Sequence, residues 1–191
     1  MADPQEALRG RIQKQVRFLE SLVERLDLHP SAVSAPVKRA VVAGSTKVFI
    51  VHGHDRAVKE STIRFVEKLG LTPIVFDESP NKGRTIIEKF EAHADVAFAV
   101  VLFTPDDVGH AAGKPEELRP RARQNVVLEL GFFLGALSRR RVCVLYKSGV
   151  DIPGDYSGVI YEEVDDRGAW RMRLAMEIKA AGIDIDLNKA L

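Results

Sequence analysis

The sequence contains a single cysteine, Cys143. One thiol cannot form an intrachain disulfide, and it cannot supply the several ligands of a cysteine-based zinc site. A lone thiol is typical of proteins kept in a reducing compartment, so we expect a cytoplasmic protein. Because Cys143 stands within an apolar run, we interpret it as an inert core residue.

Long hydrophobic runs are also absent. The stretch Val96–Phe103 is among the longest, and it is far shorter than the ~20 apolar residues that a membrane-spanning helix requires. The first residues show neither a basic leader nor an apolar signal core, so we expect no export and no membrane partner. The remaining composition, 46% hydrophobic and 29% charged over 191 residues, is that of a folded globular domain with an appendage.

The chain has no marked excess of positive or negative charge. The chain has 28 Lys and Arg against 27 Asp and Glu, a formal net charge of +1. That balance gives no electrostatic reason to expect a nucleic-acid partner. A Walker lysine pattern and a G-x-G-x-x-G fingerprint are both missing, which argues against a P-loop or a standard dinucleotide-binding site.

Three zones differ in composition, at residues 1–28, 29–46 and 47–191. The first predicts an amphipathic helix over Pro4–Leu28, with apolar positions spaced by 4, 3, 4 and 3 residues. This helix either packs on its own domain or forms a short coiled coil between subunits. The second zone has the prolines, small residues and lack of periodicity of a linker. The apolar positions of the first zone are Ile12, Val16, Leu19, Val23 and Leu26.

The third zone alternates strand and helix patterns, which predicts an α/β domain. Apolar runs without polar alternation are typical of parallel strands covered on both faces, so we expect a central parallel sheet of about five strands. The expected strands are 47–53, 72–76, 96–103, 141–146 and 159–164, and the expected helices are 55–69, 85–94, 121–138 and 169–181.

In such a fold, function resides in the loops that follow the strands, at the carboxyl edge of the sheet. Three polar loops qualify here: 52–55 (HGHD), 77–84 (DESPNKGR) and 104–107 (TPDD). The second carries Gly83 and Arg84 just before a helix, a combination that can contact phosphate. Ordinary solvated turns are the alternative interpretation of all three loops.

The helix expected over 121–138 is apolar on nearly every side, and between Arg123 and Arg139 its only charge is Glu129. A helix of that kind is buried. A carboxylate placed there is either satisfied by an arginine or backbone donors, or it is a functional group at the rim of a pocket. Asn125 precedes Glu129 by one turn on the same face.

His52 and His54 have a spacing that can bind a metal ion. No compact third and fourth ligand accompanies them, so we expect no metal site.

Together these segments resemble the TIR (Toll/interleukin receptor) superfamily, and most closely the bacterial TIR-like effectors of cyclic-nucleotide antiphage systems. The resemblance extends over 47–191. It is carried by residues 48–55 (VFIVHGHD), 80–88 (PNKGRTIIE), 119–131 (RPRARQNVVLELG), 155–158 (DYSG) and 183–188 (IDIDLN). The chain departs from animal and plant members in having NVVL at 125–128 rather than tryptophan or cysteine residues ahead of the glutamate.

The resemblance implies a flavodoxin-like, three-layer fold preceded here by the N-terminal helix. It implies cleavage of NAD at the nicotinamide–ribose bond, with NAD as substrate and no bound cofactor. Glu129 occupies the position of the catalytic glutamate. The expected substrate-binding residues are His52, Gly53, His54, Asp55, Arg84, Thr104, Asp106, Arg123 and Asn125. The expected partners are further copies of the chain and a cyclic-nucleotide-sensing protein.

Two other functions remain open from the sequence. One is a non-catalytic TIR-type adaptor that uses the same loops to contact partners. The other is a relative that acts on a nucleotide other than NAD. A buried glutamate favours an enzyme over an adaptor, because an adaptor has no use for it.

Overall fold

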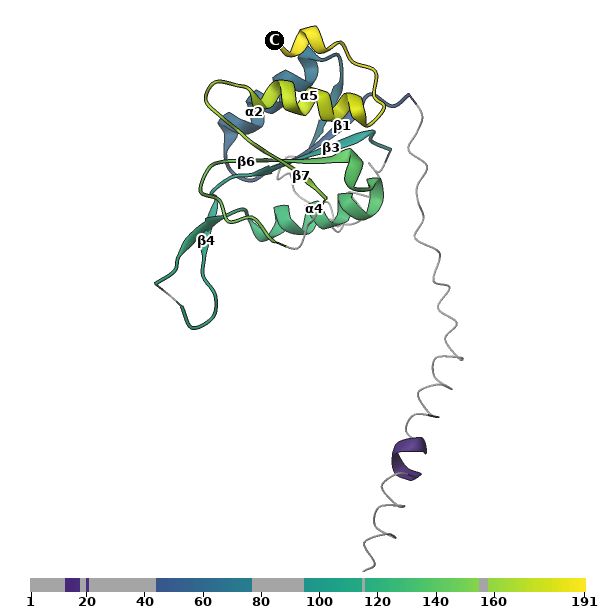
Figure 1. Cartoon of the computed structure of the whole chain (residues 1–191), viewed down its shortest axis with the longest axis vertical. Helices are drawn as coiled ribbons and strands as arrows, with labels where there is room; N and C mark the ends of the chain where they lie inside the picture. The colour runs from purple at the N-terminus through teal and green to yellow at the C-terminus, as the bar shows by residue number, and fades with distance from the viewer. Residues whose placement is uncertain (1–12, 18–19, 21–43, 77–94, 115, 155–157) are drawn as a thin grey trace, which may run out of the picture. The chain divides into compact units, whose positions relative to one another are not determined.

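The computed structural model describes residues 13–17, 20, 44–76, 95–114, 116–154 and 158–191 (Figure 1). The chain divides into two compact units, Met1–Val37 and Lys38–Leu191. In the first unit, residues 13–17 and 20 are helical, and Val16 is exposed. The other four positions of the predicted apolar stripe lie outside the described residues.

The second unit is built on a five-stranded sheet whose strands are all parallel, as predicted. Their order across the sheet is β2-β1-β3-β6-β7. The edge position of β2 suits Pro73, which has no N–H to donate to a further strand. The strands are β1 (Lys47–Val51), β2 (Thr72–Val75), β3 (Phe98–Phe103), β6 (Val142–Tyr146) and β7 (Ile160–Glu163).

Helices cover both faces of the sheet. Helices α2 (Arg56–Lys68) and α5 (Trp170–Ala180) pack on one face, and α4 (Gln124–Leu137) packs on the other (Figure 1). The short 3-10 helices η1 (Arg139–Arg141) and η2 (Leu187–Ala190) complete the described helices. This three-layer α/β arrangement confirms the predicted fold class. The loop 77–84 and the helix expected over 85–94 lie outside the described residues.

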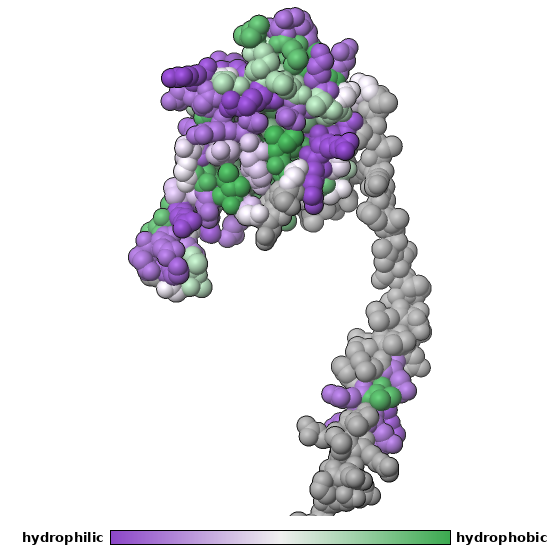
Figure 2. All heavy atoms as spheres, in the orientation of Figure 1, coloured by the Kyte–Doolittle hydropathy of each residue, from purple (hydrophilic) through white to green (hydrophobic). Residues whose placement is uncertain are grey.

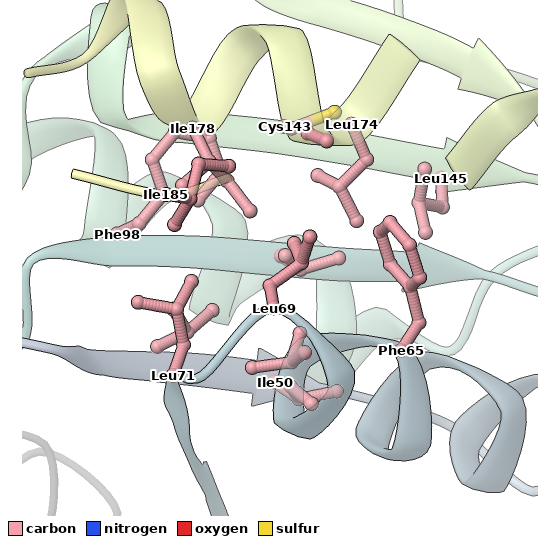
Figure 3. Close-up of a cluster of buried hydrophobic side chains, with 14 of the residues drawn as sticks. Ile50, Phe65, Leu69, Leu71, Phe98, Cys143, Leu145, Leu174, Ile178 and Ile185 are labelled. Atoms are coloured by element: carbon pink, nitrogen blue, oxygen red, sulfur yellow. The ribbon is translucent and has the colours of Figure 1, made fainter. Parts of the chain in front are cut away.

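The buried side chains form two clusters because neighbouring residues of a strand point to opposite faces. Ile50, Phe98 and Leu145 face α2 and α5, where they meet Phe65 and Leu174 (Figure 3). Phe49, Val101 and Phe103 face α4. Cys143 is fully buried in the first cluster, and this burial raises the pKa of its thiol, as expected for an inert core residue.

The start of the helix predicted over 121–138 was wrong. Arg119–Arg121 form β5, which pairs antiparallel with β4 (Asp107–Gly109), and α4 begins only at Gln124. Arg121 pairs with Asp107 of β4 and forms a bridge with Asp151, so its backbone is extended rather than helical. The carbonyl of Pro120 also accepts a hydrogen bond from the backbone N–H of Asp151 at 2.7 Å, which fixes the strand.

The β4–β5 hairpin stands clear of the body of its unit (Figure 2). It carries two large apolar side chains, Val108 and Leu118, which are 63% and 59% exposed. The hairpin therefore joins β3 to α4 through a projecting arm that the sequence patterns did not indicate.

Candidate active site

The strands β1, β3 and β6 end at the same edge of the sheet, and we call this the carboxyl edge. It brings together the loop after β1 (His52–Asp55), the loop after β3 (Thr104–Asp106) and Lys147, which follows β6. The same edge receives the N-terminus of α4, because α4 connects the end of β3 to the start of β6.

Asp106 fixes the backbone of the loop after β1. Its Oδ1 accepts a hydrogen bond from the His54 N–H at 3.0 Å, and its Oδ2 accepts one from the Thr104 hydroxyl at 2.5 Å. A side chain on Gly53 would collide with the Asp106 carboxylate, so glycine is required for this close approach. Thr104 is buried, and it therefore acts on Asp106.

Asp55 joins the same loop to both α2 and β6. Its carboxylate caps α2 by accepting a hydrogen bond from the Val58 N–H at 3.0 Å, and it pairs with Lys147 Nζ at 3.0 Å. Burial acts to raise the pKa of Asp55, but the Val58 N–H and the Lys147 ammonium outweigh it and hold the pKa below its usual value.

His52 is anchored through both ring nitrogens. Nδ1 lies 2.8 Å from the Gly53 carbonyl oxygen, and Nε2 lies 3.1 Å from that of Phe76, just beyond the end of β2. The edge of the ring is thus occupied by the protein. Only the ring faces remain to contact a ligand.

Glu129 lies in the second turn of α4, close to the carboxyl edge. One turn further along the helix, Phe133 packs on Phe49 of β1, with ring centroids 4.6 Å apart. Residues four apart lie on the same side of a helix, so Glu129 is directed toward the β1 side of α4. His52 follows Phe49 by three residues toward the same edge. Glu129 and the loop after β1 therefore both lie toward the carboxyl edge of the sheet.

The carboxylate of Glu129 is partly buried and poorly compensated. Burial raises the pKa of Glu129 to about 7, and the nearby positive charge of Arg123 opposes this only in part. In the described part of the chain, no hydrogen bond or ion pair to this carboxylate is formed. A carboxylate so placed is typical of a functional site rather than of structural pairing.

Three further residues were predicted for the site. Arg123 immediately precedes α4, and Asn125 is exposed in its first turn. Arg84 lies outside the described residues. Lys147 was missed by the sequence analysis, because nothing local to it shows that β6 ends opposite Asp55. Among the described residues, no group of three or more His, Cys, Asp or Glu side chains is arranged to hold a metal ion.

We expect Asp106→Ala to destabilise the domain, because the buried Thr104 hydroxyl and the His54 N–H lose their acceptor. An unsatisfied buried donor costs about 1–3 kcal/mol, which for a chain of this size lowers the melting temperature by about 3–10 °C. Asp106→Asn retains an acceptor oxygen and should lose much less. Thermal denaturation followed by circular dichroism tests this, and equal losses in both variants would contradict the proposed role of Asp106.

The five-stranded parallel sheet with helices on both faces is the fold of flavodoxin-like TIR domains. A comparison with protein families makes this specific. The model described as "CAP12/Pycsar effector protein, TIR domain" matches residues 47–166, and the chain belongs to this family.

Three relatives share parts of the sequence. Protein YuaY of Escherichia coli (strain K12) is 47% identical over 92% of this chain, and protein tirC of Dictyostelium discoideum is 35% identical over 60% of it. The Pycsar effector protein BcPycTIR of Burkholderia cepacia is 39% identical over 38% of it. The matched regions make up 56%, 62% and 25% of these relatives, so the chain corresponds to only part of each.

No helix in the described ranges is both long and apolar enough to span a membrane.

Proposed function

We propose that this protein is an NAD glycohydrolase (NAD⁺ nucleosidase) that cleaves the bond between nicotinamide and ribose. The observation that carries the proposal is Glu129, a partly buried carboxylate with a raised pKa, in the second turn of α4 and near the carboxyl edge. Ligands bind at this edge in α/β folds with parallel sheets.

The chemistry requires one carboxylate. When the C1′–N bond breaks, both of its electrons stay with nicotinamide, which leaves as a neutral molecule and needs no general acid. The ribosyl group becomes oxocarbenium-like, and a carboxylate that is already desolvated stabilises this positive charge. Water then attacks C1′ and releases a proton to give ADP-ribose, or the adenine ring attacks C1′ to give the cyclic product.

The rest of the carboxyl edge suits the remainder of NAD. Arg123 makes no side-chain cap at the start of α4, and the first N–H groups of a helix favour an anion, so we assign the diphosphate to these N–H groups and to the Arg123 guanidinium. We assign stacking on a base to the faces of the His52 ring, because both ring nitrogens already contact backbone carbonyls. We assign the remaining contacts to His54, Asp55, Arg84 and Asn125, and we assign to Gly53, Thr104 and Asp106 the shaping of the loop that bears His52 and His54.

We further propose that the chain acts in the cytoplasm in antiphage defence. The support is its membership of the CAP12/Pycsar effector family and its similarity to BcPycTIR. On this proposal a cyclic-nucleotide-sensing partner delivers the activating signal, and cleavage requires self-association of the chain.

Incubation of the purified full-length chain with NAD, followed by chromatography for free nicotinamide, tests the activity. We expect nicotinamide to appear together with ADP-ribose or its cyclic form, at a rate that rises with protein concentration. Absence of nicotinamide at every concentration, with no cleavage of other nucleotides, would favour the non-catalytic adaptor. Cleavage of a different nucleotide, with NAD left intact, would favour a relative that acts on a nucleotide other than NAD.

Self-association through the N-terminal stripe gives a separate prediction. We expect Leu19→Asp/Val23→Asp to lower both the mass in solution and the activity, because each buried unpaired charge in an apolar seam costs several kcal/mol. The matched control is Gln13→Asp/Lys14→Asp, which changes exposed positions of the same helix. Light scattering and the nicotinamide assay measure the two effects. A double variant with unchanged mass and activity would assign the helix to packing within one subunit or to a dispensable tail.

A further inference from the structure

A groove of about 980 Å³ lies between α2 and the start of α5, on the face of the sheet opposite α4. Figure 1 shows the two helices on this face. The sheet separates the groove from Glu129, so the groove is not part of the candidate active site. Its volume lies at the upper end of the range for small-molecule sites, ~300–1,000 Å³.

The groove is strongly basic. Arg56, Arg64 and Lys68 line it from one side of α2, spaced by multiples of four residues, and Arg167 and Arg171 line it from the start of α5. The opposing charged side chain in its lining is that of Glu60, and Lys68 Nζ donates a hydrogen bond to the backbone oxygen of Leu191 at 2.7 Å. The side chains of the lining therefore carry four net positive charges, five cations against one carboxylate, compared with a formal charge of +1 for the whole chain.

Most of these cations are not neutralised. Within the described residues, Arg56, Arg64 and Arg167 take part in no ion pair, although they share the groove with Glu60. Clustered, unpaired cations raise the local concentration of anions and lower the energetic cost of desolvating one.

Arg171 is held in place before any ligand arrives. Its Nη2 donates a hydrogen bond to the Ser61 hydroxyl at 3.0 Å, and its guanidinium lies over the Trp170 ring, 4.8 Å from the centroid. Gly168, with φ of +80°, leaves the space that this guanidinium fills. An arginine fixed in this way loses little conformational entropy on binding an oxyanion.

The lining also includes the apolar side chains of Ala57, Phe65 and Met172. A ligand that matches the groove combines an apolar planar group with a phosphate. Free inorganic phosphate can contact only the cations, and a nucleoside can contact only the apolar side chains. A nucleotide can contact both the cations and the apolar side chains.

We propose that the α2–α5 groove is a second ligand site, which binds the phosphate and base of a nucleotide. Arg64, Arg167 and Arg171 contact the phosphate, and Ala57 and Met172 contact the base. The site is independent of NAD cleavage at Glu129. It gives the chain a place to detect a nucleotide that is not its substrate.

Trp170 makes a direct test possible, because it is the only tryptophan of the chain and its buried ring contacts Arg171, which lines the groove. We titrate 5′-AMP into the full-length Glu129→Gln variant and follow tryptophan emission and calorimetric heat. Inorganic phosphate and adenosine serve as fragment controls. We expect saturable binding of 5′-AMP that is at least tenfold tighter than that of either fragment, and that weakens as salt is added.

The groove variant is Arg64→Ala/Arg167→Ala, and the matched control is Arg140→Ala/Lys179→Ala, which removes two exposed charges elsewhere. We expect the groove variant to bind 5′-AMP about tenfold to a hundredfold more weakly, and the control to bind as before. The proposal is overturned if 5′-AMP does not bind, if a fragment binds as tightly, or if both double variants lose affinity equally. It is also overturned if the groove variant alters only the mass in solution, which would indicate a contact between subunits. A chain that binds 5′-AMP in the groove but never cleaves NAD would overturn the proposed enzyme activity alone.

Discussion

Glu129→Gln is expected to abolish release of nicotinamide from NAD while leaving the domain folded. The substitution keeps the size of the side chain and removes the charge that stabilises the oxocarbenium-like ribose. Loss of one such electrostatic contact costs about 10²–10³ in rate in other enzymes, and here the carboxylate is the only proposed catalytic group, so we expect at least the upper end of that range. Single-turnover assays at pH 8 measure it.

The matched control is Glu67→Gln, which neutralises an exposed glutamate on α2, on the other face of the sheet. This variant should cleave NAD at the wild-type rate. A folded Glu129→Gln protein that retains turnover would remove Glu129 from the mechanism. A variant that fails to fold would instead assign the carboxylate a structural role.

The order of the main elements could be predicted because each strand in the centre of a parallel sheet is apolar throughout. The run Val96–Phe103 indicated a buried strand without reference to any other part of the chain, and Phe98–Phe103 are indeed fully buried. The β4–β5 hairpin could not be predicted in this way. Its strands have three residues each, and none of these residues is buried, so no hydrophobic period marks them.

The candidate site was predictable to the extent that its chemistry is local. Glu129 is conspicuous in the sequence because it is a charge within an apolar helix. The contact of Asp106 with His54 joins two loops that lie 52 residues apart, and the ion pair of Asp55 with Lys147 joins the segments that follow β1 and β6. Only the strand order β1-β3-β6 brings these groups together, so the shaping role of Asp106 and the presence of Lys147 required the structure.

The raised pKa of Glu129 gives the second large prediction, which concerns pH. A carboxyl with a pKa of about 7 in the folded chain, against its ordinary 4.5, binds a proton more tightly when folded. Its contribution to stability is therefore greatest below pH 4.5, and it is lost as the pH rises through 7. Asp55, with its lowered pKa, acts in the opposite direction, since its contribution is lost as the pH falls.

The difference in melting temperature between the wild type and Glu129→Gln isolates the effect of the Glu129 carboxyl. At pH 5 the wild-type carboxyl is protonated and resembles the amide, so the two proteins should melt at similar temperatures. At pH 8 the buried charge destabilises the wild type by roughly 2–3 kcal/mol, and the variant should melt about 5–10 °C higher. A melting difference that does not change between pH 5 and pH 8 would show that Glu129 has an ordinary pKa.

Catalysis should follow the opposite trend, because only the ionised carboxylate stabilises a cationic ribose. We expect kcat/KM for NAD to fall about tenfold for each pH unit below 7, since this ratio reports the free enzyme. The positive charge of bound NAD at its nicotinamide ring favours the carboxylate, so kcat should decline only at a lower pH than kcat/KM does. Steady-state rates measured from pH 5 to pH 9 separate the two profiles. If kcat/KM is constant from pH 8 down to pH 5, the group that limits cleavage is not a carboxyl with the pKa of Glu129.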